Sequence, residues 1–161
     1  MRAIGQAERA LDKMIIEATD PKKTPFGKTK ASHQTVLFEI ATSRMEIEQA
    51  RLLVLNAAAK IDSVGTKAAL REIGMSKVIV PNVLGRILDR AIQITGAAGM
   101  SDAHELASMF SNYRTLRFVD GPDAVHHEQV GKTELRRAET LRKMYLGYKT
   151  KGHEVVTRGR L

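Results

Sequence analysis

The sequence predicts an all-α protein, an up-and-down four-helix bundle with an extra C-terminal helix. Apolar residues recur at helical spacing through several long stretches, and no stretch alternates apolar and polar residues as a half-buried strand would. Aromatic residues make up only 4% of the chain and Trp is absent, so Leu, Ile, Val, Ala and Met must fill the core. These residue types favour helices over sheets.

The first predicted helix covers residues 2–19, where Ile4, Leu11 and Met14 recur at helical spacing, and Asp20-Pro21 ends it. No Ser, Thr, Asp or Asn precedes this helix to cap it, so we expect its natural start to lie before Met1. The following loop, residues 21–32, contains two prolines, four lysines and the aromatic Phe26. Loops of this length often have a function.

Two long helices are predicted next, over residues 33–62 and 66–95, separated by a break at Gly65. The first has a broad apolar surface, and a helix of that length, about 45 Å, is typical of bundles. The second contains Pro81, which predicts a kink rather than an end. Gly96 and Gly99 are expected to end it.

A shorter helix is predicted over residues 103–118, followed by a turn at Asp120-Gly121-Pro122. Pro122 would take the first position of the last bundle helix, which runs to about residue 137. Residues 138–161 are basic and are expected to extend that helix and fray. We therefore divide the chain into a helical bundle, residues 1–137, and a basic C-terminal extension, residues 138–161.

Composition excludes several classes of protein and site. Without Cys there can be no disulfide, thiolate metal site or Cys nucleophile. No apolar run reaches the roughly 18 residues of a membrane span, and the N-terminus lacks an apolar signal core. The net charge of +8 would suit nucleic acid or a phosphorylated ligand, but no aromatics are interleaved with the basic residues, so we expect no nucleic-acid partner. The five His lack partners at ligand spacing, and we predict no metal site.

Several short motifs occur at or near the predicted helix ends. They are Gly5 to Leu11, Phe26-Gly27-Lys28, Arg51-Leu52-Leu53, Ala91 to Gly99, Arg114 to Arg117, and Asp120-Gly121-Pro122-Asp123. In this order and spacing they resemble the C-terminal helical domain of the acyl-CoA dehydrogenases, over about residues 5–137. The Asp-Gly-Pro-Asp variant followed by Val125-His126 is most similar to the branch that contains family members ten and eleven.

The resemblance implies an FAD enzyme that oxidises the Cα–Cβ bond of an acyl-CoA thioester, in which a carboxylate removes the α-proton and the β-hydride passes to the flavin. Asp120 occupies the place of the family's catalytic glutamate, with one methylene less, and Gly121 follows it in the substrate site. A carboxylate can act as a base near neutral pH if burial raises its pKa. From the residues alone, Asp120 could equally be the N-cap of the last helix.

The resemblance also implies six cofactor-binding residues. They are Lys23, Phe26, Gln93, Gly96, Pro122 and Ala124. Lys23 takes the place of an Arg near the FAD pyrophosphate of a neighbouring subunit, and Gln93 belongs to a segment that contacts that same FAD. From the residues alone, Gln93 could instead be a buried amide, Gly96 a helix C-cap, and the lysines a solvated loop.

Two hypotheses follow. In the first, the chain is the C-terminal part of an FAD-dependent acyl-CoA dehydrogenase, acting in fatty acid metabolism and forming a homodimer or tetramer. The family's N-terminal helical and middle β-domains are missing or come from a separate chain, so the isolated chain should have negligible activity. It would be intracellular: cytoplasmic in a bacterium, mitochondrial or peroxisomal in a eukaryote. In the second, it is a non-catalytic helical oligomerisation or interaction module whose basic tail binds an acidic partner or nucleic acid.

Overall fold

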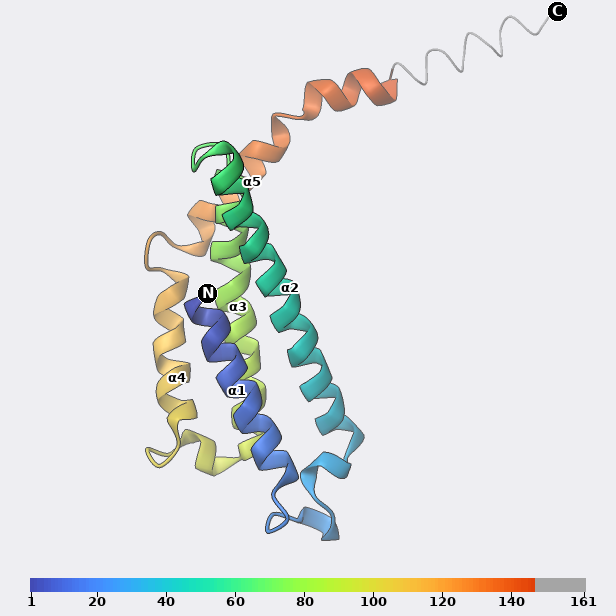
Figure 1. Ribbon diagram of the computed structural model, residues 1–161, viewed down its shortest axis with the longest axis vertical. Coiled ribbons are helices and arrows are strands. Elements are labelled where there is room, and N and C mark those ends of the chain that lie inside the picture. Colours follow the sequence, from blue (N-terminus) through green and yellow to red (C-terminus); the bar gives the residue numbers. More distant parts are fainter. Residues whose placement is uncertain (147–161) are drawn as a thin grey trace, which may run out of the picture.

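A computed structural model describes residues 1–146, and in that range the chain forms the five α-helices α1 to α5, a further helical stretch over residues 138–146, and no strand (Figure 1). The helices are α1 (Arg2–Thr19), α2 (Gln34–Val64), α3 (Leu70–Thr95), α4 (Glu105–Tyr113) and α5 (Asp123–Leu135). Helices α1 to α4 lie side by side along the long axis, and α5 follows near one end (Figure 1). The predicted all-α bundle is confirmed.

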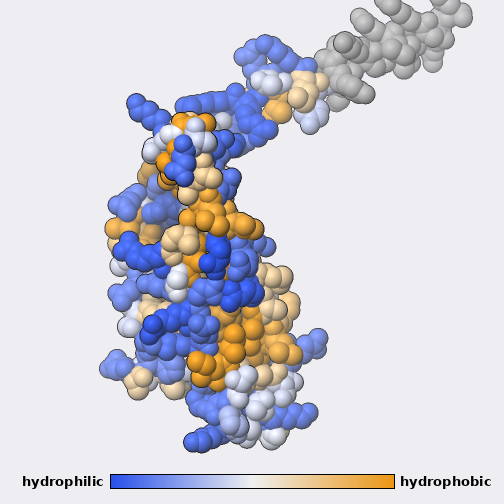
Figure 2. All heavy atoms as spheres, in the orientation of Figure 1, coloured by the Kyte–Doolittle hydropathy of each residue, from blue (hydrophilic) through white to orange (hydrophobic). Residues whose placement is uncertain are grey.

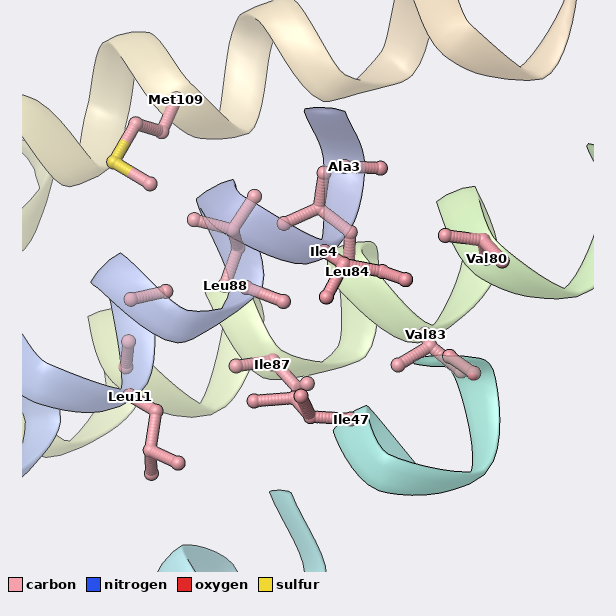
Figure 3. Close-up of a cluster of buried hydrophobic side chains, with 14 of the residues drawn as sticks. Ala3, Ile4, Leu11, Ile47, Val80, Val83, Leu84, Ile87, Leu88 and Met109 are labelled. Carbon is pink, nitrogen blue, oxygen red and sulfur yellow. The ribbon is translucent and has the colours of Figure 1, made fainter. Parts of the chain in front are cut away.

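Helix α3 is the centre of the bundle, because it packs against α1, α2, α4 and α5. Its buried residues recur every three or four positions, and Leu84, Ile87 and Leu88 are completely buried. They meet Ile4 from α1 and Ile47 from α2 in one apolar cluster (Figure 3). Burial of this stripe is what fixes the direction of α3, and with it the positions of both of its ends.

A glycine in α3 lets α4 approach closely. A Cβ atom added at Gly85 would lie 2.5 Å from Cε2 of Tyr113, at the end of α4, which is closer than two carbon atoms can come. The Tyr113 ring also contacts Phe110, with ring centroids 5.2 Å apart in an edge-on arrangement. The glycine therefore fixes where α4 ends and where the following turn begins.

Several helix ends differ from the sequence prediction. Helix α3 begins at Leu70 rather than Thr66, because residues 66–69 form a turn in which the Ala69 amide binds the carbonyls of Gly65 and Thr66. Pro122 is the N-cap of α5 and not its first residue, since its ψ of 157° is extended. Consequently Asp120 does not cap α5, and that interpretation of its role is wrong.

The predicted extension of the last helix is interrupted. Residues 136–137 form a turn, and residues 138–146 are helical and project away from the bundle (Figure 1). The remainder of the basic extension, residues 147–161, lies outside the described residues. Within residues 1–146 no helix is long and apolar enough to cross a membrane, and no three His, Asp or Glu side chains are grouped so as to hold a metal ion.

Candidate functional site

The turn before α5 places Asp120 in an unusual backbone conformation. Its φ is 57°, and that of Gly121 is 101°, so two consecutive residues lie in the region that favours glycine. Asp tolerates this region better than most residues do. The Asp120 side chain is exposed and lies at the rim of a hollow of about 260 Å³, which Arg2, Val80 and Leu116 also line.

Two side chains from neighbouring helices bind the backbone of this turn. The Lys77 ammonium, on α3, donates to the carbonyl of Leu116 at 2.8 Å and to that of Gly121 at 3.2 Å. Nε2 of His126, on α5, lies 3.2 Å from the carbonyl of Asp120, and since a carbonyl only accepts, Nε2–H donates. The turn is therefore bound from both sides.

The second acid of the motif has a different environment. Asp123 is largely buried, and its Oδ2 accepts hydrogen bonds from Nε of Arg117 at 2.8 Å and from the amide of Asn82 at 3.2 Å. Burial by itself would raise the pKa of Asp123, but these two donors hold it below its usual value. Asp123 is thus committed to an ion pair. No hydrogen bond or ion pair within residues 1–146 involves the carboxylate of Asp120.

Three of the predicted cofactor residues lie together at the other end of α3. Phe26, Gln93 and Gly96 line a hollow of about 560 Å³, together with Lys30 and His33. Phe26 has a φ of 59° and is 95% exposed, and its ring meets that of His33 edge-on with centroids 6.4 Å apart. The Gln93 side chain is exposed, so the interpretation of Gln93 as a buried amide is wrong.

Gly96 is the C-cap of α3, with a φ of 79°, as the sequence predicted. It also lines the hollow, so its structural role does not exclude the cofactor role.

The composition of the loop suggested that its lysines are simply solvated, but Lys23 and Lys30 are not. Both ammonium groups bind the buried carboxylate of Glu17, Lys30 at 2.6 Å, and Lys30 also donates to the carbonyl of Ile94 at 2.7 Å. This network joins the end of α1, the loop and the end of α3. Lys30 lines the hollow, whereas Lys23 reaches it only indirectly, through Glu17.

The ion pairs of Glu17 with Lys23 and Lys30 should make the stability of the fold depend on pH. Burial alone would raise the pKa of Glu17, but hydrogen bonds from Lys23 and Lys30 outweigh it and lower the pKa below 4.5. A carboxylate with a lowered folded pKa stabilises the fold above its unfolded pKa, and that stabilisation disappears as the pH falls below it. We expect Glu17→Gln to cost about 1–3 kcal/mol at pH 7 and less at pH 2, in urea unfolding at both pH values, because the stabilisation is lost as the pH falls through the folded pKa.

The matched control for Glu17→Gln is Glu128→Gln, in an exposed pair with Lys132. This variant should change the unfolding free energy by less than about 0.5 kcal/mol at either pH. An equal loss in Glu17→Gln at both pH values would contradict the assignment of the stabilisation to the ionised carboxylate.

The remaining predicted residues lie at the Asp120 end. Pro122 ends the turn, and Ala124 lines a third hollow of about 530 Å³ beside Arg86 and Arg117. Lys77 and Gln93 are separated by 16 positions on α3, which corresponds to about 24 Å. The structure therefore brings Phe26, Gln93 and Gly96 together and leaves the Asp120 turn far from them.

The sequence analysis assigned no role to Lys77, Arg117 or Glu17. Lys77 is a lone charge between buried apolar positions of α3, which is a weak signal for a buried ammonium with nearby acceptors. Arg117 and Glu17 each have apolar neighbours in the sequence, Leu116 and Phe118 for Arg117 and Ile16 and Ala18 for Glu17, and no role was predicted from that pattern.

Comparison with known proteins decides the family. Residues 1–135 match the family model described as acyl-CoA dehydrogenase, C-terminal domain. The chain belongs to the acyl-CoA dehydrogenase family. It is 48% identical over 136 residues to acyl-CoA dehydrogenase family member 10 of Mus musculus, covering 84% of this chain and 12% of that protein.

Solved structures share the fold. A Mycobacterium abscessus protein assigned to the acyl-CoA dehydrogenases superposes with a TM-score of 0.82 and 41% identity, covering 86% of this chain and 33% of that one. The FAD complex of PigA gives a TM-score of 0.76 and 25% identity, covering 84% of this chain and 34% of that one. The chain thus spans about a third or less of these relatives.

Proposed function

We propose that this chain supplies the general base of an FAD-dependent acyl-CoA dehydrogenase, with Asp120 removing the α-proton of an acyl-CoA thioester. The observation that supports this most is the contrast between the two acids of the turn. Asp123 is occupied by Arg117, whereas the Asp120 carboxylate has no partner within residues 1–146 and borders a hollow.

Asp120 is exposed in this chain, and an exposed carboxylate is a weak base at neutral pH. The proposal therefore requires other protein to cover the turn and exclude water, because a carboxylate removed from water is a stronger base. The family's N-terminal and middle domains are the proposed source of that cover, either in the same polypeptide or in a separate chain. Without them the acyl-CoA cannot be oriented, and orientation contributes much of the rate.

The hollow at the other end of α3 fits part of an FAD molecule. An exposed aromatic ring, Phe26, stands beside the Gln93 carboxamide and the Lys30 ammonium, which can contact a flat ring, a polar edge and a phosphate respectively. When bound, FAD would accept the electron pair and the hydrogen from the substrate Cβ. Lys23 contributes by holding Lys30 and the loop through Glu17.

The separation of the two ends indicates that they serve different flavins. We propose that Pro122 and Ala124 face the flavin paired with Asp120, whereas Phe26, Gln93 and Gly96 face that of a neighbouring subunit. This arrangement requires a homodimer or tetramer. Helix α2 offers a surface for association, since six of its large apolar side chains are at least half exposed: Leu37, Phe38, Met45, Leu52, Leu55 and Val64. On the face drawn in Figure 2, apolar residues form a band along the bundle.

The test compares the chain alone with a chimera in which it replaces the corresponding C-terminal portion of the Mycobacterium abscessus relative. Flavin absorbance and turnover of a panel of acyl-CoA esters, measured with an electron-accepting dye, are the readouts. We expect no stoichiometric flavin and no turnover with the chain alone, and both with the chimera. Turnover by the chain alone would refute the need for further domains, and a folded but inactive chimera would refute the catalytic role.

A second candidate function rests on the C-terminal extension. Residues 136–161 lie beyond the family match and contain eight of the 26 Lys and Arg residues but only two of the 18 Asp and Glu residues. Helix 138–146 is exposed and projects from the bundle (Figure 1). Salt-dependent binding of the chain to heparin that deletion of residues 138–161 abolishes, together with a folded chimera that binds no flavin, would favour a non-catalytic interaction module.

A further inference from the structure

We infer that Lys77 is a positioning residue, which fixes the backbone of the turn and with it the place from which the Asp120 side chain extends. This inference rests on the proposed role of Asp120 as the base. Lys77 lies on α3, more than 40 residues before the turn, and α3 is the most buried helix of the bundle. It can therefore transmit the rigidity of the core to an otherwise exposed loop.

The two bonds from Lys77 enclose the turn. Its ammonium donates to the carbonyl of Leu116, before the turn, and to that of Gly121, after Asp120. An ammonium has three donors and no acceptor, so one side chain can satisfy both carbonyls at once. Lys77 is itself partly buried, where hydrogen bonds from a charged group are stronger than in water. Only a long cationic side chain at this position can join both flanks.

The turn needs such restraint because its backbone conformation is unfavourable. Asp120 has a φ of 57°, which costs a residue with a Cβ energy and persists only where the surroundings impose it. His126 supplies a third bond, to the Asp120 carbonyl, and it stands so close that a Cβ at Gly121 would lie 3.1 Å from its Nε2. Side chains from α3 and α5 thus bind three carbonyls within six residues.

No partner holds the Asp120 carboxylate itself within residues 1–146, so only the backbone of the turn restrains its position. If the turn relaxes, the carboxylate moves with it. A displacement of about 1 Å at a reacting group can cost about a hundredfold in rate. Loss of Lys77 should therefore reduce turnover without removing any group that touches the substrate carbon.

The first experiment uses this chain alone and needs no activity. We compare Lys77→Met with Lys132→Met, a control at an exposed lysine paired with Glu128 on α5. Amide hydrogen exchange of residues 116–123 should become about tenfold faster in Lys77→Met and stay unchanged in the control, with the core equally protected in both. Unchanged exchange in Lys77→Met would overturn the inference.

Chemical rescue separates the ammonium from simple packing. The chain has no Cys, so Lys77→Cys introduces a single thiol that bromoethylamine converts to an aminoethyl side chain of nearly lysine length. Alkylation is done in urea before refolding. The alkylated protein should recover slow exchange over residues 116–123, and the unalkylated one should not. If both exchange equally slowly, the ammonium has no positioning role.

The second experiment uses the chimera with the Mycobacterium abscessus relative. Lys77→Met should lower kcat about a hundredfold and change KM by less than about threefold, whereas a variant that merely destabilised the fold would lower the active fraction and leave kcat per bound flavin unchanged. An unchanged kcat per flavin refutes the inference. Full activity of Asp120→Asn would instead refute the proposed base, and the exchange result would still show whether Lys77 holds the turn.

Discussion

Replacing Asp120 by Asn should lower kcat/KM of the assembled enzyme by about 10²–10⁴-fold, the usual contribution of a positioned general base. Asn has the same shape as Asp and cannot accept the proton. The side chain is exposed and has no partner within residues 1–146, so the unfolding free energy should change by less than about 0.5 kcal/mol. Turnover of an acyl-CoA ester and urea unfolding of the same preparation measure the two effects.

Asp123→Asn is the matched control, three residues further along the same motif. It breaks the ion pair with Arg117 inside a largely buried site and should cost about 1–3 kcal/mol of stability. Asp123→Asn should therefore lower the free energy of unfolding more than it lowers turnover per folded molecule. If Asp120→Asn remained fully active while a folded Asp123→Asn lost turnover, the base would be Asp123 and the proposed assignment would be wrong.

The bundle was predictable because its determinants are local. The predicted C-terminal end of α1 is confirmed at Thr19, because the residue before Pro21, Asp20, is extended as the residue before a proline usually is. The start of α3 was not predictable in the same way, because Thr66 to Ala69 suit a helix and only the reversal of the chain after Gly65 imposes a turn. The exposure of Gln93 could have been foreseen: the buried positions 84, 87, 88, 91 and 95 form one stripe, and 93 lies off it.

The turn that carries Asp120 was predictable from the sequence, but the side chains from other segments that bind the backbone around the candidate site were not. The Asp120-Gly121 turn is marked by residues adjacent in sequence. Lys77 binds carbonyls that lie 39 and 44 positions away, and Lys30 binds one 64 positions away. Backbone carbonyls occur at every position, so nothing in the sequence marks which ones a lysine will bind. The packing of α3 decides it.

Replacing Leu88 by Ala should have the largest effect on stability, a loss of about 2–5 kcal/mol. Leu88 is completely buried on α3, in the apolar cluster beside α1 and on the side of Met109 from α4 (Figure 3). Removing three carbon atoms forfeits their burial and leaves a cavity that four packed helices cannot fill. Urea unfolding followed by circular dichroism, at one fixed protein concentration, gives the free energy of unfolding. The slope of the unfolding free energy against urea concentration should be the same as in the unsubstituted chain.

Leu135→Ala is the control, because Leu135 is 73% exposed at the end of α5, and its loss should stay below about 0.5 kcal/mol. A loss below about 1 kcal/mol in Leu88→Ala would show that α3 is not the rigid centre of the bundle. That outcome would also weaken the functional argument, since α3 holds Lys77 near one end and Gln93 at the other. Both ends can keep a fixed geometry only while the buried stripe between them stays packed.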